Sequence, residues 1–184
     1  MSQTYSDNQF LDQRLIIEKV GIEKGMKVAE LGCGSTGFFI FPLAQVVGKE
    51  GAVYAVDILK SALESVKSKA TINNLKQIKT VWSNLEIFNA TAIETESLDV
   101  IFLVNTLHQS QKRVDVIREA RRMLKRNGKL LIVEWNDSDL PAGPPPENKV
   151  KIDLLKNGMQ KLGMRLEEEF SAGNYHYGLI FIKS

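Results

Sequence analysis

Short apolar segments, bounded by glycines or polar turns, alternate along this chain with longer segments whose apolar residues recur every three or four positions. This alternation predicts strands buried on both faces and connected by helices, as in an α/β protein with a mostly parallel sheet. The first five strands are expected at residues 28–31, 52–57, 78–82, 98–104 and 129–134. Two closing strands are expected at residues 165–170 and 175–182, joined by a hairpin turn at 172–174.

A first helix is expected near the N-terminus, at residues 10–20. Its apolar face consists of Phe10, Leu11, Leu15, Ile16, Ile17 and Val20. Asp7 or Asn8 is its expected N-cap, and Gly21 is expected to end it. The helix is interpreted as a cover for the core, although residues 1–7, with Tyr5, are an alternative cover for a functional site.

Two further helices have distinctive compositions. Residues 38–47 are apolar nearly all round, so this helix should be buried, and Pro42 inside it should remove a hydrogen bond or bend it. The helix at residues 113–126 has an inward face of Val114, Ile117, Ala120, Met123 and Leu124, and an outward basic face of Arg118, Arg121, Arg122, Lys125 and Arg126. A basic face of this kind is ordinarily solvated, and phosphate binding is the alternative.

The segment at residues 135–146 contains four of the five prolines and follows the carboxyl end of a predicted strand. It is expected to be semi-rigid, and it is interpreted either as a wall of a substrate pocket or as a stiff connector to a helix at 149–162.

Composition narrows the class of protein without deciding it. A length of 184 residues suits one domain, expected at 21–184 with the N-terminal helix at 1–20 covering its core. The net charge of +2 is too small to indicate nucleic-acid binding by itself. Cys33 is the only cysteine, so no internal disulfide and no cysteine-based metal site is expected. With no apolar run as long as a membrane span, a cytoplasmic protein is expected.

The candidate chemistry starts at residues 27–37, where a short strand runs into three glycines spaced as G-x-G-x-x-G. Such a loop lets a ligand approach the backbone. Glu30 stands two positions before Gly32, where a carboxylate would repel a pyrophosphate but would favour a cationic ligand. S-adenosylmethionine is cationic and carries no phosphate, which favours it over a dinucleotide as the ligand of Gly32, Cys33 and Gly34.

An acid also ends the second strand. Asp57 is placed to accept hydrogen bonds from both ribose hydroxyls of an adenosine, and the alternative role is the N-cap of the next helix. Ile58 would then lie against the adenine face. Asn84 and Leu85 follow the third strand, where the adenine edge would fall, although Asn84 could equally be a turn residue.

The fourth strand is followed by Asn105 and, three residues later, by His108. Ligands of open α/β sheets bind at the carboxyl ends of the strands, so polar residues here are candidates for a site. Asn105 is a candidate cofactor contact. His108 is a candidate general base, and its alternative role is that of a loop histidine bonded to backbone.

These motifs together resemble class I S-adenosylmethionine-dependent methyltransferases, and the resemblance covers about residues 21–184. Residues 25–34 resemble the cofactor loop of that family, residues 53–57 its ribose-binding strand, and residues 123–130 its turn into the fifth strand. Small-molecule enzymes, including quinone-ring C-methyltransferases, are the most similar type. The resemblance implies a three-layer Rossmann-like sandwich with strand order 3-2-1-4-5-7-6 and an antiparallel seventh strand.

The expected function is methyl transfer from S-adenosylmethionine to a small-molecule acceptor, at oxygen, carbon or nitrogen. His108 is the first candidate for the base, with Glu134 and Asp137 behind it. No metal is expected, nucleic acid is a disfavoured partner, and a homodimer is left open. The alternatives are a nicotinamide-dependent oxidoreductase and a non-catalytic module that binds S-adenosylmethionine.

Overall fold

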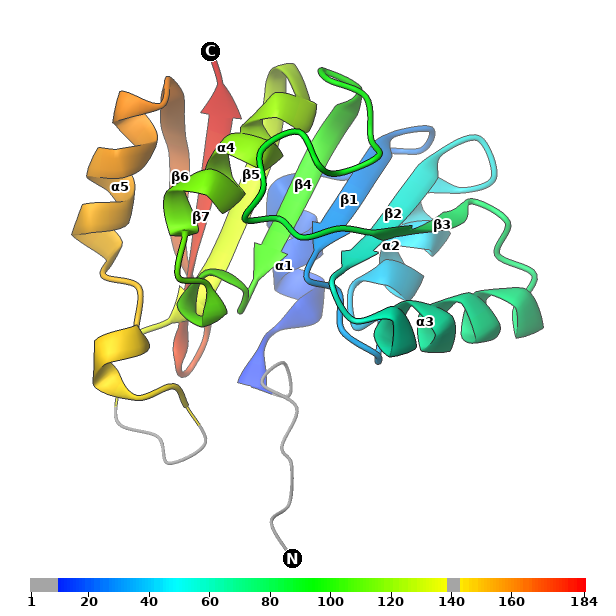
Figure 1. The fold of residues 1–184 in the computed structure, drawn as a ribbon, viewed down its shortest axis with the longest axis horizontal. Helices are drawn as coiled ribbons and strands as arrows, with labels where there is room; N and C mark the ends of the chain where they lie inside the picture. The colour runs from blue at the N-terminus through cyan, green and yellow to red at the C-terminus, as the bar shows by residue number, and fades with distance from the viewer. Residues whose placement is uncertain (1–9, 139–142) are drawn as a thin grey trace, which may run out of the picture.

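A computed structural model describes residues 10–138 and 143–184 of the chain. It contains a seven-stranded sheet with helices on both faces (Figure 1). The strands are β1 (Lys27–Leu31), β2 (Ala52–Asp57), β3 (Ile78–Trp82), β4 (Leu98–Val104), β5 (Leu124–Trp135), β6 (Met164–Gly173) and β7 (His176–Lys183). Their order is β3-β2-β1-β4-β5-β7-β6, and β7 is antiparallel to both of its neighbours. The predicted fold class and strand order are confirmed.

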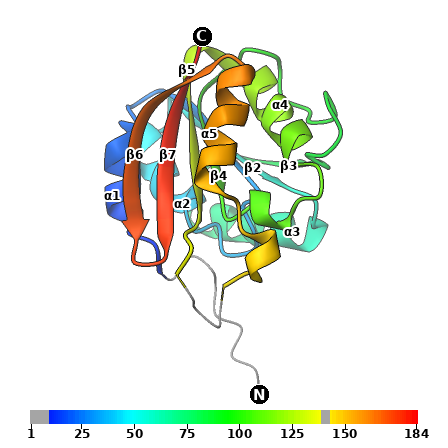
Figure 2. The ribbon, with the colours of Figure 1, turned by 90° about the vertical axis from the view of Figure 1, so that its left-hand side faces the viewer.

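The helices form two layers. They are α1 (Gln13–Val20), α2 (Ile40–Val47), α3 (Lys60–Ile72), α4 (Arg113–Met123) and α5 (Ile152–Lys161), with short 3-10 helices η2 (Leu107–Gln109) and η3 (Pro146–Asn148). Side chains of α1, α2 and α3 share one buried cluster with the sheet, and those of α4 and α5 share the cluster on the opposite face. Figure 2 shows the sheet nearly edge-on, with α1 and α5 on its two sides.

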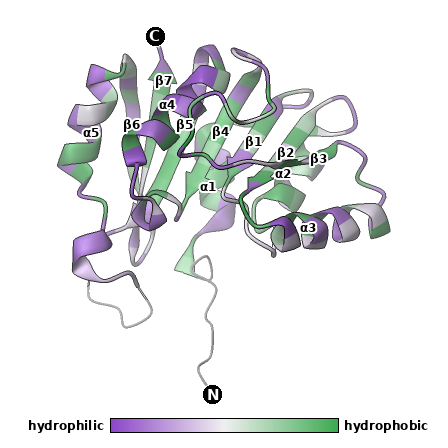
Figure 3. Ribbon diagram, viewed as in Figure 1, coloured by the Kyte–Doolittle hydropathy of each residue, from purple (hydrophilic) through white to green (hydrophobic). Residues whose placement is uncertain are grey.

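The central strands are buried on both faces, which explains their continuous apolar sequences. Figure 3 shows the sheet as a mainly hydrophobic layer, whereas the helices have polar outer faces. Among the described residues, no helix is both long and apolar enough to cross a membrane.

The N-cap of α1 is Asp12, whose carboxylate accepts a hydrogen bond from the backbone N–H of Leu15 at 3.0 Å. The prediction of Asp7 or Asn8 as the cap is therefore wrong, and both lie outside the described residues. The helix starts late because the chain before it is held elsewhere: the N–H of Asp12 donates to the carbonyl of Ala172 at 3.0 Å. Gly21 ends the helix with a positive φ of 71°, as predicted.

Helix α2 begins at Ile40, two residues later than predicted. Pro42 therefore lies in the first turn of the helix. The N–H groups of Phe41 and Leu43 on either side of it donate to the carbonyls of Gly37 and Phe39, at 3.4 and 3.0 Å, so Pro42 interrupts this series of hydrogen bonds, as predicted. The helix was predicted to be buried, and Ile40, Leu43, Ala44 and Val47 are, whereas Val46 on its outer side is 39% exposed.

Helix α4 ends at Met123, and the next residue already belongs to β5. The predicted helix to residue 126 and strand start at residue 129 are both wrong, because Leu124 pairs with Leu98 in the sheet. The predicted inward face is wrong at Val114, which is 53% exposed.

The predicted outward face of α4 is wrong at Arg122. Its side chain is 8% exposed and pairs with Glu119, which is fully buried. The carboxylate of Glu119 also accepts the backbone N–H groups of Asn89 and Thr91, at 2.7 and 3.0 Å. This buried pair therefore fixes the segment that follows β3.

At the C-terminal end of the chain, β6 extends to Gly173 and the hairpin turn consists of residues 174 and 175, slightly later than predicted. Because β7 is antiparallel, its amino end lies at the same edge of the sheet as the carboxyl ends of β1, β2, β4 and β5, the lower edge in Figure 1. The candidate site residues gather along this edge.

Candidate active site

The glycine loop leaves β1 at Leu31 and turns through residues with positive φ. Gly32, Gly34 and Gly37 have φ values of 82°, 61° and 63°, which glycine adopts without steric strain. A Cβ on Gly34 would meet no atom within 4 Å, whereas a Cβ on Gly32 would lie 2.8 Å from Oγ1 of Thr106. Gly34 therefore borders open space that a ligand could fill, while Gly32 is required for packing against Thr106.

Glu30 lies at the end of β1 and is only 2% exposed. Burial, and then the nearby charge of Asp57, raises the pKa of Glu30 well above its usual value, while hydrogen bonding to the backbone of Ile40 and Phe39 acts against this shift. Its Oε2 atom is buried and has no hydrogen-bond partner in the part of the chain that the structure describes. A buried carboxylate oxygen without a partner is suited to a cationic group of a ligand.

Asp57 lies at the end of β2, where its carboxylate is bonded on both oxygens. Oδ2 accepts the N–H of Gly34 and Oδ1 accepts the N–H of Leu59, both at 2.9 Å. It is not the N-cap of α3, since that position is Leu59, and the alternative role predicted for Asp57 is wrong. A carboxylate has about four acceptor positions, so two bonds to backbone orient it and leave capacity for ribose hydroxyls.

The residues expected around an adenine differ in their exposure and in their hydrogen bonds. Ile58 is 52% exposed and offers an apolar surface. Leu85 packs partly into the core, and Oδ1 of Asn84 accepts the N–H of Glu86 at 3.0 Å, which is the bond of a turn residue. Cys33 is buried, and burial raises the pKa of its thiol, so a thiolate is disfavoured there.

The end of β4 is tied to the end of β1 by Thr106, which sequence reasoning did not single out. Its hydroxyl lies 2.9 Å from the carbonyl oxygen of Leu31 and 3.1 Å from that of Val104. Asn105 is buried with a φ of 52°, and its N–H donates to the carbonyl of Val133 at 2.9 Å. These contacts fix the point between β1 and β4 where the strand order reverses, the usual place for a ligand in such sheets.

His108 contacts a buried carboxylate. Its Nδ1 lies 2.9 Å from Oε2 of Glu134, and the two side chains are 8% and 0% exposed. The other oxygen, Oε1, accepts the N–H of Leu107 at 2.6 Å, so Glu134 cannot rotate freely. Because a carboxylate only accepts, Nδ1 of His108 is the donor in this contact, and in a neutral imidazole Nε2 is then the acceptor. Glu134, expected as a second candidate for the base, therefore contacts both the ring of His108 and the backbone beside it.

The second histidine lies nearby and was not predicted as a site residue. His176 begins β7 directly opposite Trp135, and the centroids of their rings are 4.2 Å apart. This histidine lies within the predicted strand at residues 175–182, but no motif marks it as a site residue. It reaches the edge of the sheet that carries the site only because β7 runs antiparallel.

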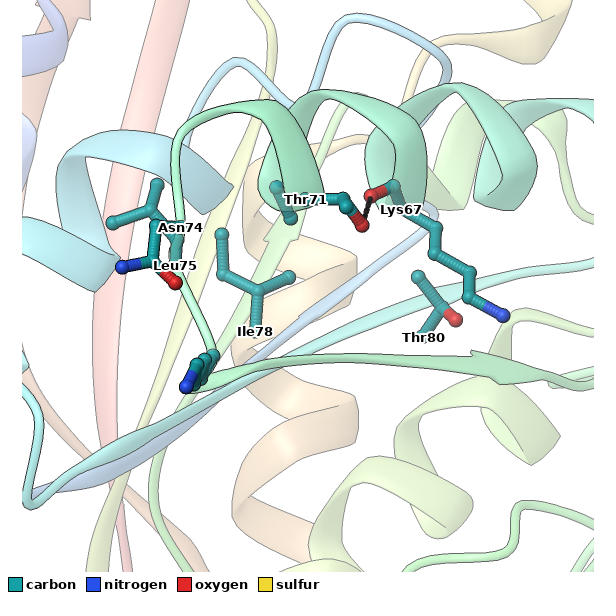
Figure 4. A pocket seen from close by; sticks show the side chains of 8 residues that line it. Lys67, Thr71, Asn74, Leu75, Ile78 and Thr80 are labelled. Carbon is teal, nitrogen blue, oxygen red and sulfur yellow. Dashed lines mark hydrogen bonds between the residues drawn. The ribbon is translucent and has the colours of Figure 1, made fainter.

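A hollow elsewhere in the molecule contains none of these residues. It has a volume of about 300 Å³ and lies between the end of α3 and the edge strand β3. Figure 4 shows its lining of Lys67, Thr71, Asn74, Leu75, Ile78 and Thr80, with a hydrogen bond from the hydroxyl of Thr71 to the carbonyl of Lys67. Ile78 is at the amino end of β3, so this hollow lies away from the carboxyl ends of the strands. Within the described ranges, no cluster of acidic, histidine or cysteine side chains could hold a metal ion.

A family model described as a methyltransferase domain matches residues 22–171. This chain belongs to that family. The predicted resemblance to methyltransferases is thereby confirmed. The residues present fit S-adenosylmethionine, because Oε2 of Glu30 has no partner among the described residues, Gly34 borders open space and Asp57 has free acceptor capacity.

Relatives of this methyltransferase act in quinone biosynthesis according to their names. A demethylmenaquinone methyltransferase of Lactococcus lactis is 29% identical over 125 residues, covering 68% of this chain. The ubiquinone/menaquinone biosynthesis C-methyltransferase UbiE of Shewanella sediminis is 31% identical over 128 residues, covering 67% of this chain. The matched region is 48% of either relative, so this chain spans about half the length of the relatives that it matches.

Solved structures share the fold of this methyltransferase. A SAM-dependent methyltransferase from Aquifex aeolicus superposes with a TM-score of 0.86 at 24% identity, covering 96% of this chain and 92% of that one. The [4+2]-cyclase SpnF superposes with a TM-score of 0.79 at 11% identity, covering 93% and 80%. The fold is therefore shared with a protein named for a different reaction, and the site must carry the functional argument.

Proposed function

We propose that this chain transfers the methyl group of S-adenosylmethionine to a small-molecule acceptor, and that His108 takes the proton that the acceptor loses. The observation that carries the proposal is the contact between His108 and the buried carboxylate of Glu134 at the carboxyl ends of β4 and β5. A histidine held in this way is an oriented base rather than a loop residue bonded to backbone.

The residues of β1 and β2 are assigned to the cofactor. Glu30 faces a cationic group of it, Gly34 lets it approach the backbone, and Asp57 accepts from the ribose. Ile58 covers one face of the adenine. The bound cofactor supplies an activated methyl group on a sulfonium, so the main task of the protein is to position the acceptor in line with it.

The residues after β4 and β5 are assigned to the acceptor. With Nδ1 of His108 donating to Glu134, Nε2 is the atom that can accept a proton. The buried carboxylate also stabilises the imidazolium that forms. A positioned base of this kind contributes about 10²–10⁴-fold to the rate when the acceptor must be deprotonated.

A small molecule is a better acceptor than a nucleic acid, because the basic residues near α4 are mostly engaged. The ion pairs are Arg118 with Asp115, Arg122 with Glu119, and Lys125 with Asp99. The names of the relatives make demethylmenaquinone the first acceptor to test. A cytoplasmic location and a homodimer stay predictions.

The two alternatives differ in what they would bind. A nicotinamide-dependent oxidoreductase would place a pyrophosphate beside Glu30, which offers this anion no positive charge and would repel it when ionised. A non-catalytic module would bind the cofactor as the enzyme does but would show no turnover. The fold is also that of SpnF, which is named as a cyclase, so the fold alone does not establish methyl transfer. Binding tests the first alternative, and turnover tests the second.

The cofactor assignment is tested by calorimetry with S-adenosylhomocysteine. Asp57→Ala should weaken binding by about 1.5–3 kcal/mol, roughly ten- to a hundredfold, because hydrogen bonds to a charged group are lost. Asp99→Ala is the matched control, since Asp99 also accepts a backbone N–H, that of Lys27 at 2.8 Å, but at the amino end of β4. Equal affinity in the two folded variants, or tighter binding of NAD than of S-adenosylhomocysteine, would remove the cofactor assignment.

The base assignment is tested by turnover of demethylmenaquinone and of a panel of phenols. His108→Ala should lower kcat by about 10²–10⁴-fold while changing the affinity for S-adenosylhomocysteine little. Glu134→Gln should also lower kcat, because an amide NH₂ facing Nδ1 favours the other tautomer of His108. A normal kcat in His108→Ala would refute the base, and no turnover on any acceptor would favour the non-catalytic module.

A further inference from the structure

Two buried side chains beside the proposed base have polar atoms without partners. His176 is 1% exposed and Trp135 is 2% exposed. Both ring nitrogens of His176 and Nε1 of Trp135 lack a hydrogen-bond partner among residues 10–138 and 143–184. Buried polar groups in folded proteins are almost always bonded, so three unbonded nitrogens on two adjacent rings indicate a place where a ligand completes the bonding.

These rings lie at the edge of the sheet that carries the site. Trp135 is the last residue of β5 and follows Glu134, while His176 is the first residue of β7. The views in Figures 1 and 2 agree that the β6–β7 turn lies at the end of the sheet where β5 finishes. Phe10 packs edge-on against Trp135, with ring centroids 6.3 Å apart, and adds apolar surface.

The chemistry of the two rings selects an uncharged ligand. Burial, and then the charge of His108, lowers the pKa of His176 to about 4, so its ring is neutral near pH 7. A neutral imidazole offers one donor and one acceptor, and an indole offers one donor. An anionic group could not form an ion pair with these neutral rings, and it would lie near the buried carboxylate of Glu134.

We propose that His176 and Trp135 bind an uncharged oxygen of the acceptor, a hydroxyl or a carbonyl carried on an apolar ring. This inference rests on the proposed function, and it adds a specificity contact to it. His108 acts on the proton that is lost, whereas His176 and Trp135 hold the acceptor by an oxygen and by ring stacking. Acceptors with a carboxylate or phosphate at this position are then excluded.

The test is the ¹⁵N spectrum of histidine-labelled protein, which contains signals from only the two histidines of the chain. His108→Asn leaves the signals of His176 and so assigns them. The probes are p-cresol, toluene and 4-methylbenzoate, added to protein saturated with S-adenosylhomocysteine and to protein without it. We expect p-cresol to shift at least one ring nitrogen of His176, toluene to shift it much less, and 4-methylbenzoate not to shift it.

A matched pair of variants tests the tryptophan. Trp135→Phe keeps an aromatic ring and removes the N–H, and it should weaken p-cresol binding by about fivefold, the worth of one neutral hydrogen bond. Trp82→Phe should leave this affinity unchanged, because Nε1 of Trp82 already donates to the carbonyl of Ile58 at 2.8 Å.

Each outcome separates this inference from the proposed function. If His176 does not respond to p-cresol, or responds equally to toluene, in protein that binds S-adenosylhomocysteine, the oxygen contact is refuted and the cofactor assignment stands. If His176 responds in protein that does not bind S-adenosylhomocysteine, the oxygen contact stands and methyl transfer is refuted. The wild-type spectrum decides these outcomes even if a variant fails to fold.

Discussion

Glu30 is a buried carboxylate that we expect to lose a proton when the cofactor binds. Burial and the charge of Asp57 raise the pKa of Glu30 in the free protein, and a cationic ligand beside Oε2 would lower it again. Binding of S-adenosylmethionine should therefore release protons, and its affinity should rise with pH until Glu30 is ionised in the free protein. Calorimetry in two buffers with different ionisation enthalpies measures this release.

Glu30→Gln is the control for the proton release. The amide keeps the shape of the side chain but cannot titrate, so the release should disappear and the affinity should fall by about 1.5–3 kcal/mol. If the variant releases as many protons as the wild type, some other group titrates and the placement of a cation beside Glu30 is wrong.

His176 should make the free energy of unfolding depend on pH. The pKa of His176 is lowered to about 4 in the folded protein from an ordinary value of 6.5, so the unfolded chain binds the proton more readily. The contribution to stability is complete above about pH 6.5 and is lost as the pH falls toward 4. At one unit of pKa per 1.36 kcal/mol, it amounts to about 3 kcal/mol. Urea unfolding between pH 4.5 and 7.5 measures it.

The comparison with His176→Phe isolates this contribution from others. Glu30 acts in the opposite direction, because the raised pKa of Glu30 makes the folded protein less stable as the pH rises above about 4.5. The difference between wild type and His176→Phe removes the part due to Glu30. A difference that does not change between pH 4.5 and 6.5 would mean that His176 is protonated as easily in the folded protein as in the unfolded chain.

At the scale of elements, the segment before α1 is joined tightly to the β6–β7 hairpin. A Cβ on Gly173 would lie 2.1 Å from the carbonyl oxygen of Phe10, and Asp12 donates to Ala172 beside it. Gly173→Ala should therefore push this segment away and lower stability by about 1–3 kcal/mol. It should also remove the contact of Phe10 with Trp135 and so change the tryptophan fluorescence.

Gly158→Ala is the matched control for Gly173→Ala. Gly158 lies inside α5, and a Cβ there would meet no atom within 4 Å. This variant should raise stability by about 0.5–1 kcal/mol, because alanine is the better helix former. Thermal unfolding measures whether Gly173→Ala is less stable and Gly158→Ala more stable than the wild type. A Gly173→Ala protein as stable as the wild type would show that the segment at Phe10 can move away without a loss of stability.

Strands were predicted more accurately than helix ends, for a physical reason. A strand buried on both faces is an apolar run in the sequence, so β2 and β4 were located to the residue. The ends of helices instead depended on distant contacts. Helix α4 stops at Met123 because Leu124 pairs with Leu98, and α1 starts after Asp12 because Asp12 is bonded to Ala172. No local pattern reveals such partners.

The same distinction applies to the site. Glu30, Asp57 and His108 could be located because each closely follows or ends a predicted strand. Thr106 and His176 could not, because their importance depends on side-chain contacts that the predicted strand order and direction do not specify. The contact of Glu134 with His108 was missed for the same reason.

At the scale of the whole molecule, cofactor binding should stabilise the fold by mass action. S-adenosylhomocysteine at about 100 times its Kd should add about 2.7 kcal/mol to the free energy of unfolding. For a chain of this size, that corresponds to a rise in Tm of about 5–10 °C. Differential scanning fluorimetry with S-adenosylhomocysteine and with NAD measures it, and an equal rise with both ligands would contradict the proposed selectivity for a cofactor without phosphate.

The direction of β7 also affects how the acceptor range can change during evolution. The two-residue turn between β6 and β7 lies at the edge of the sheet that carries the site, yet it belongs to the last hairpin of the chain. Residues inserted into an exposed turn extend into solvent without altering the strand pairing. The proposed cofactor contacts at Glu30, Gly34 and Asp57 come from an early part of the sequence. Evolution can therefore lengthen or change the β6–β7 hairpin to accommodate new acceptors, while the proposed cofactor contacts at Glu30, Gly34 and Asp57 stay unchanged.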